Sequence, residues 1–153
     1  MLTDILKINV EGKKYFTSTF MKERVVITAF CIGCVFLFTF YQSDQLKASV
    51  ERGKSIYEAN CMSCHMAEGQ GLEGAFPPLA NTGRLSDKGR LVKILFNGIS
   101  GPITVKGKDY DMEMTPVNLS NEEVADVLNY IRNSWGNKNI ILTVDEVKKI
   151  RMQ

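Results

Sequence analysis

The sequence predicts an all-α fold in which several short helices follow a single transmembrane helix. Three observations support this prediction. Residues 25–41 form an uncharged, mostly apolar run. In three later segments apolar residues recur at the spacing of one helix face, and two further positions carry capping boxes that begin helices. A chain of 153 residues leaves room for one domain of about a hundred residues after the apolar run.

The apolar run is the predicted membrane anchor. Seventeen residues, Val25 to Tyr41, would make a helix roughly 25 Å long, the short end of a membrane span. Lys22 and Arg24 precede the run and Asp44 follows it. Positive residues favour the cytoplasmic side, so we expect residues 1–24 in the cytoplasm and the rest of this single-pass chain outside.

Three alternatives for this run are weaker. A cleaved signal peptide has a shorter apolar core and a cleavage site of small residues. A buried core helix is not usually apolar on all sides. Lipid modification of Cys34, which follows Gly33, would interrupt a run that continues through Phe40. Cys31 and Cys34 are most simply small buried hydrophobes, and the sequence leaves open whether either is modified.

After a short polar linker, residues 42–47, the pattern predicts five helical or extended segments. The first helix ends near Asn60, and a second helical stripe ends at Gly98. A small hairpin or extended loop follows at residues 101–111. The remaining two helices begin with capping boxes and the first of them ends after Trp135. Residues that carry these predictions are Leu46, Val50, Gly53 and Tyr57; Leu91, Ile94 and Leu95; Ser120, Glu123, Val124, Val127, Leu128 and Ile131; Thr143 and Glu146.

The motif Cys61-Met62-Ser63-Cys64-His65 is the attachment pattern for c-type haem. Residues i and i+3 lie on one face of a helical turn, so both thiols can add to the vinyl groups along one edge of a flat porphyrin. His65 then lies beneath the iron as its proximal ligand. A zinc site would need four ligands, and a thioredoxin-like pair would need a βαβ setting. We therefore expect one covalent haem c, carrying one iron.

Charge limits the partners. From Ala48 onward the chain has thirteen Lys or Arg and thirteen Asp or Glu residues, so this part is formally neutral. Recognition of nucleic acid relies on a basic face, and we predict no nucleic-acid partner. Bacteria attach c-type haem outside the cytoplasmic membrane, which agrees with the predicted topology and places the haem domain on the periplasmic side of the inner membrane.

Because His65 is the only histidine, the sixth position of the iron must carry methionine, lysine, water or nothing. Met62 and Met66 lie beside the haem cysteines on the proximal side and cannot reach around the porphyrin. Met112 and Met114 remain. They are two residues apart and would share a face of an extended segment, so periodicity does not choose between them.

From about Ala48 to Asn137 the chain resembles a class I cytochrome c, on the helix with Gly53 and Tyr57, the haem motif, the proline-leucine loop, the methionine before a proline and the later helix. The resemblance implies a domain at residues 48–137 followed by a helical extension at residues 138–153. It also implies that the first and last helices of the domain cross near Gly53 and an aromatic residue such as Tyr130.

The resemblance also assigns roles in the site. It implies that Met114 is the distal ligand, with Met112 as the alternative. It further implies that a proline carbonyl accepts a hydrogen bond from His65, with Pro77 as the best match and Pro78 as the second. Tyr57 and Leu79 are candidate haem-pocket residues, although each could be plain core.

These features predict an electron carrier rather than an enzyme. Histidine and methionine together close both axial positions and raise the iron's reduction potential. We expect single electrons to pass between respiratory or periplasmic redox partners, a donor and an acceptor whose identities are open. A haem enzyme or gas-binding protein with an open sixth position is one alternative, and a haem subunit of an oxidase or dehydrogenase complex is another.

Overall fold

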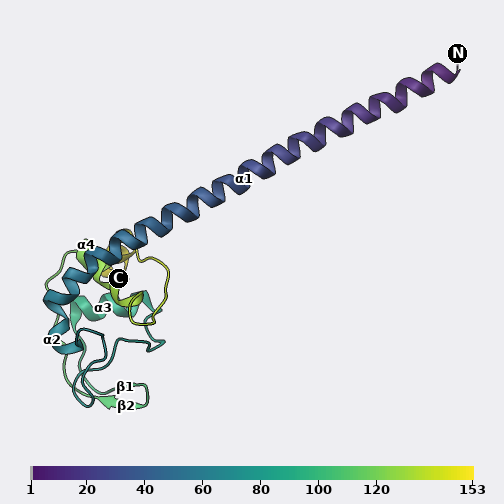
Figure 1. The fold of residues 1–153 in the computed structure, drawn as a ribbon. Helices are drawn as coiled ribbons and strands as arrows, with labels where there is room; N and C mark the ends of the chain where they lie inside the picture. The colour runs from purple at the N-terminus through teal and green to yellow at the C-terminus, as the bar shows by residue number, and fades with distance from the viewer. Residues whose placement is uncertain (1) are drawn as a thin grey trace. The chain divides into compact units, whose positions relative to one another are not determined.

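The computed structural model describes residues 2–153, with side chains described for residues 24–35 and 37–153. The predicted, mostly helical fold is confirmed (Figure 1). In chain order the elements are α1 (Leu2–Asn60), α2 (Met62–His65), α3 (Lys88–Asn97), β1 (Ile103–Val105), β2 (Lys108–Tyr110), α4 (Asn121–Arg132) and α5 (Val144–Arg151). The chain divides into two compact units, residues up to 42 and residues 43–153.

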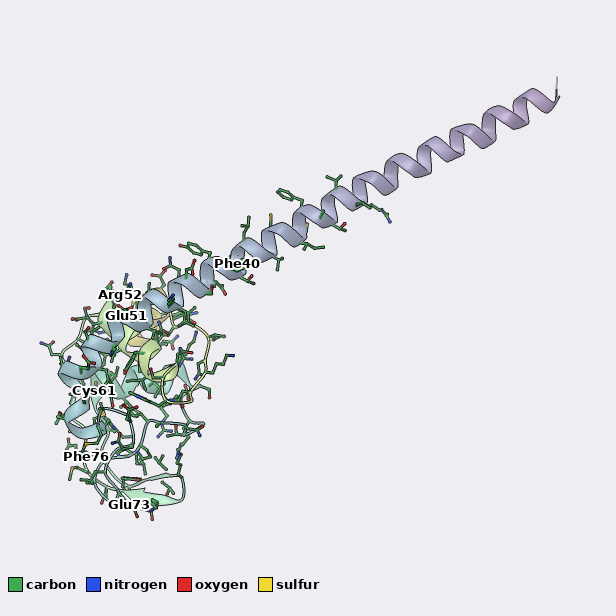
Figure 2. The ribbon with its side chains drawn as sticks, in the orientation of Figure 1. Phe40, Glu51, Arg52, Cys61, Glu73 and Phe76 are labelled. Atoms are coloured by element: carbon green, nitrogen blue, oxygen red, sulfur yellow. The ribbon has the colours of Figure 1, made fainter. Side chains whose placement is uncertain are left out.

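The first unit is the N-terminal part of α1. The apolar side chains described between residues 25 and 41 are exposed, and Phe40, labelled in Figure 2, is 65% exposed. Among the described residues, one helix is long and apolar enough to cross a membrane, and it includes the run at residues 25–41. A membrane anchor and a signal sequence both have these properties. A long run of exposed apolar side chains is typical of a helix that lies in lipid or another apolar phase.

Residues 42–47 are helical, where we predicted a short polar linker. They contain no glycine or proline that would break the helix. Gln45, Leu46 and Lys47 are good helix formers, and propensity therefore favours continuing the helix. Polarity marked the end of the apolar run correctly but did not mark a change in backbone conformation.

The second unit is built on the crossing of α1 with α4. A Cβ atom built on Gly53 would lie 2.0 Å from the Asp126 carbonyl oxygen and 2.9 Å from Tyr130 Cβ. The two backbones therefore approach at a distance that only glycine permits. This confirms the crossing predicted at Gly53 and Tyr130.

A polar network holds this crossing together. Ser49 Oγ donates to Asp126 Oδ1 at 2.6 Å, and Arg52 donates to both oxygens of the same carboxylate at 2.7 and 2.8 Å. Asn129 on α4 donates to Ser49 Oγ and exchanges two hydrogen bonds with the backbone of Leu142. The network therefore connects α1, α4 and the segment before α5.

The predicted capping boxes are both present, at Ser120 and at Thr143. The predicted hairpin is also present, with β1 and β2 paired antiparallel and Lys106 and Gly107 in the turn at positive φ. α3 ends at Asn97, before Gly98, as predicted. However, α4 ends at Arg132 rather than after Trp135, because the chain turns back there.

Candidate haem-binding site

α2 is one helical turn that carries the haem motif. The amide nitrogens of Cys64 and His65 both donate to the Cys61 carbonyl, at 3.2 and 2.9 Å, which closes the turn. Cys61 is buried and Cys64 is half-buried. Burial, and then the nearby Cys64 thiol, raises the pKa of the Cys61 thiol to about 11. The Cys61 sulfur is therefore a neutral thiol at pH 7 in the chain before haem attachment.

His65 is held by the loop that follows α2. Its Nδ1 donates to the Pro77 carbonyl oxygen at 3.0 Å, which is the hydrogen bond expected from the family resemblance. Because a carbonyl can only accept, Nδ1 carries the proton and Nε2 keeps its lone pair. Burial lowers the pKa of His65 and outweighs the Pro77 hydrogen bond, which raises it. A neutral imidazole with a free Nε2 is the form that binds a metal.

Gly71 lets the loop close tightly enough to present that carbonyl. Its φ is +65°, and a Cβ there would lie 2.3 Å from the Phe76 oxygen and 2.8 Å from the Pro77 carbonyl carbon. The Gly71 amide also donates to the His65 carbonyl at 3.0 Å. The glycine therefore brings residue 71 against both the histidine and the segment that holds it.

A cavity of about 880 Å³, counting the part open to solvent, lies beside His65. Most of its wall is aliphatic, with a few polar groups: Cys61, His65, Pro77, Pro78, Leu79, Thr82, Arg84, Leu85, Arg90, Leu91, Ile94, Leu95, Ile99, Ile103, Val105, Met114, Leu128 and Ile131.

Met114 lines this cavity and Met112 does not. Met114 exchanges two backbone hydrogen bonds with Ile99, each 2.9 Å long, so its position is fixed from both sides of the peptide. Gly98 permits this approach, since a Cβ there would lie 2.5 Å from the Met114 oxygen. Met112 is 54% exposed. Alternation along the strand did not distinguish the two sulfurs, whereas their burial does.

The residues present fit a haem. One wall offers a neutral imidazole and a buried thiol, and the same cavity holds a thioether, which are the donor types that c-type haem takes. Leu79 and Pro78 also line the cavity, as does the stripe Leu91, Ile94 and Leu95. A flat apolar macrocycle finds mainly aliphatic contacts there.

Tyr57 lies in the core and is not part of the cavity wall. Its hydroxyl donates to the Met66 carbonyl at 2.7 Å, and its ring packs against Tyr130 and Trp135 with centroids 5.4 and 4.9 Å away. The side chain is fully buried. The prediction that Tyr57 contacts the haem therefore has no support from this geometry, because its hydroxyl and ring are engaged elsewhere.

Sequence reasoning missed part of the cavity wall. Thr82 and Arg90 lie far from any recognisable motif, and only the fold brings them to the cavity. Arg84 also lines the cavity and donates to the Thr104 carbonyl of the hairpin. The hairpin itself contributes Ile103 and Val105, whose alternate spacing in β1 gave the signal that could have found them.

Comparison with known proteins agrees with this site. The family profile described as "Cytochrome c" matches residues 50–135. Cytochrome c-552 of Thermus thermophilus is 39% identical over 110 residues, which cover 65% of this chain and 83% of that protein. The cytochrome c subunit of the quinone-dependent alcohol dehydrogenase of Gluconobacter oxydans is 33% identical over 103 residues, covering 65% of this chain but 22% of that subunit.

A further relative is the fructose dehydrogenase cytochrome subunit of Gluconobacter japonicus, 30% identical over 119 residues, 72% of this chain and 24% of that subunit. The chain belongs to the cytochrome c family, whose members are electron carriers with covalently attached haem c, not enzymes. It is a cytochrome c domain homologous to the Thermus cytochrome c-552, with one long apolar helix at its N-terminus.

Proposed function

We propose that this chain is a membrane-anchored cytochrome c with one haem, which carries single electrons between two redox proteins. In this proposal His65 and Met114 would ligate the iron, and Cys61 and Cys64 would hold the macrocycle covalently. The observation that supports it most strongly is that an imidazole and a thiol from the haem motif line one apolar cavity together with a thioether from a later segment.

The protein side chains would determine what this site can do. The Pro77 hydrogen bond fixes the plane of the His65 ring and makes its Nε2 a better electron donor. The Met114 thioether would serve as the second iron ligand, which would leave oxygen and peroxide no place to bind. When bound, haem c supplies an iron that accepts and releases one electron at a time. The aliphatic wall excludes water and favours the reduced, less charged state.

An optical spectrum of the purified protein tests the ligation. A pyridine haemochrome assay reports whether haem is covalent and how many haems each chain carries. We expect one haem, a low-spin ferric spectrum and the weak methionine-to-iron charge-transfer band at the red end of the visible range. Met114→Ala should abolish that band and lower the potential. Met112→Ala is the matched control and should leave both unchanged, because this side chain is exposed.

The reverse result, with the band lost in Met112→Ala and kept in Met114→Ala, would refute the assigned ligand. A high-spin spectrum in the wild-type protein that shifts on adding carbon monoxide would instead support an open sixth position. In that case the gas-binding or enzymatic alternative would replace the electron carrier.

The apolar run of α1 supports the second part of the proposal, an uncleaved anchor with the haem domain on the periplasmic side. Replacing residues 1–43 by a cleavable export signal should give a soluble red protein. Mass analysis of the native chain gives a direct control, since an uncleaved anchor predicts that the purified protein retains its N-terminal residues. Persistent membrane association of the shortened chain would contradict the anchor.

Membership of a larger complex is a second candidate, favoured by the relatives. Two of them are cytochrome subunits of dehydrogenases, and this chain covers only 22% and 24% of their lengths. A single apolar helix could dock such a chain beside membrane subunits. Purification in mild detergent tests this candidate, which predicts that other polypeptides elute with the haem in fixed ratio. Elution of the chain alone would favour a free carrier.

A further inference from the structure

The chain reverses direction just after α4. Trp135 and Gly136 have positive φ, +51° and +84°, and the Asn137 amide donates to the Ser134 carbonyl at 2.9 Å. Two successive central residues of positive φ are typical of a type I′ turn. A tryptophan in this conformation is uncommon, because its Cβ crowds the backbone. The surrounding contacts must therefore hold it there.

The side chains of Trp135 and Asn137, both in this turn, contact the loop that follows α2. Trp135 packs on Gly69, where an added Cβ would lie 2.5 Å from Trp135 Cε3. Asn137 Nδ2 donates to two carbonyls at 3.0 Å, that of Leu79 in the loop and that of Ile131 in α4. Because both partners are carbonyls, only the amide nitrogen can satisfy them, and both of its protons are used.

The two contacted positions of the loop are themselves joined. The amides of Leu79 and Ala80 donate to the Gly69 carbonyl at 2.7 and 2.9 Å. The turn after α4 therefore holds the two ends of one closed loop, residues 69–80. Leu79 is fixed through both its N–H and its C=O.

Fixing Leu79 also fixes the Pro77 carbonyl. Only Pro78 separates the two residues, and the rings of Pro77 and Pro78 lock two φ angles. The residue before a proline is restricted as well, so Pro77 has little freedom in ψ. The Pro77 carbonyl oxygen accepts the hydrogen bond from His65 Nδ1. Its position is therefore fixed relative to Leu79.

We propose that Asn137 is a positioning residue for the proximal ligand. It holds the loop 69–80 closed against α4, and thereby keeps the Pro77 carbonyl within hydrogen-bond distance of His65. This inference rests on the proposed ligation of iron by His65. Asn137 itself does not line the cavity, so it acts only through the loop.

The chain offers a matched control in Asn139. Its Nδ2 also caps a carbonyl at the end of α4, that of Arg132, at 2.8 Å. Its backbone N–H donates to Asn133 Oδ1 at 2.9 Å. Asn139 is half-buried like Asn137, but the structure gives it no hydrogen bond to the loop 69–80. Replacing either residue removes a cap from α4, and only one replacement releases Leu79.

The test follows the His65 Nδ1 proton in the reduced, full-length holoprotein in detergent by NMR. In Asn137→Ala we expect this proton to exchange with deuterium about fivefold faster, the factor that loss of one neutral hydrogen bond produces. The reduction potential should move to more positive values, because a weaker Pro77 bond makes the imidazole a poorer donor to ferric iron. Asn139→Ala should leave both quantities at the wild-type values.

Asn137→Ser, whose hydroxyl is too short to reach both carbonyls, gives the same test if the alanine variant does not fold. Equal exchange rates and potentials in the Asn137 and Asn139 variants would overturn the positioning role and leave Asn137 as a helix cap. A wild-type spectrum without an iron-bound His65 would instead refute the proposed ligation, so the two failures can be told apart.

Discussion

Replacing Gly53 by alanine should open the crossing of α1 and α4. The added methyl carbon would lie 2.0 Å from the Asp126 oxygen, 2.5 Å from the Asp126 carbonyl carbon and 2.9 Å from Tyr130 Cβ, whereas ordinary contacts begin at 3.4 Å. Two of these neighbours are backbone atoms and cannot rotate away. The helices must therefore move apart by more than an ångström, or α1 must bend.

The expected loss of stability combines two opposing effects. Overpacking of a well-packed core costs roughly 1–3 kcal/mol, and a clash with backbone belongs at the upper end. Alanine in place of glycine inside a helix recovers about 1 kcal/mol. We therefore expect Gly53→Ala to lower the free energy of unfolding by about 2 kcal/mol. Separation of the helices would also lengthen the hydrogen bonds that join Ser49 and Arg52 to Asp126.

Urea unfolding of the full-length holoprotein in mild detergent measures this effect through the fluorescence of Trp135, the one tryptophan. Gly89→Ala is the control. Gly89 also lies in a helix, α3, and a Cβ there would meet only Asp87 Oδ1, at 3.5 Å. This variant should unfold at the same or a higher urea concentration. If Gly53→Ala were as stable as Gly89→Ala, the close backbone crossing would be refuted.

Two further predictions concern charged groups. Asp126→Asn should destabilise the protein by roughly 2 kcal/mol in the same urea assay, because Arg52 and Ser49 lose charged hydrogen bonds; an unchanged midpoint would contradict this. Burial raises the pKa of Glu146, but the hydrogen bonds from Lys88 and Thr143 together lower this pKa by more, so the net shift is downward. A carboxylate with a depressed pKa stabilises the fold above its unfolded pKa and loses this effect as pH falls through the folded value. Glu146→Gln should therefore unfold earlier than wild type at pH 7 and together with it below about pH 3; an equal gap at both pH values would refute the ion pair with Lys88.

Local sequence patterns predicted the parts of the fold that are determined locally. The capping boxes at Ser120 and Thr143 depend on residues three apart, and both are present. The hairpin turn at Lys106-Gly107 is likewise a short-range feature. The haem motif specifies its own helical turn. In each case neighbouring residues supply the hydrogen bonds that define the structure, so no distant contact could change the result.

Features that depend on distant contacts were harder to predict. The end of α4 at Arg132 depends on Trp135 packing against Gly69, in a loop more than sixty residues earlier. The burial of Tyr57 away from the cavity depends on two aromatic partners from the C-terminal half. No local pattern contains this information.

The extension at residues 138–153 shows the same limit. Its sequence predicted an amphipathic terminal helix, and α5 confirms this. It did not reveal that Leu142 and Val147 are almost completely buried in the domain core. Lys88 also donates to the Ile141 carbonyl at 2.8 Å and to Glu146 at 2.7 Å. The extension is therefore packed into the domain, whereas the sequence predicted only that it follows the domain.

The choice between Met112 and Met114 needed both sources of information. Sequence spacing left the two sulfurs equivalent, and the family resemblance favoured Met114. The structure adds an independent physical difference, because the backbone pairing of Met114 with Ile99 turns residue 114 to the cavity wall while residue 112 is exposed.

The most direct test of the axial pair is the NMR spectrum of the reduced protein with its methionine methyl groups labelled with carbon-13. A methyl on a sulfur bound to the iron lies over the porphyrin ring, whose ring current shifts its proton signal far upfield. We expect one such shifted methyl signal, present in Met112→Ala and absent in Met114→Ala. A spectrum with no shifted methyl, or one whose shifted signal disappears with Met112, would contradict the pairing of His65 with Met114.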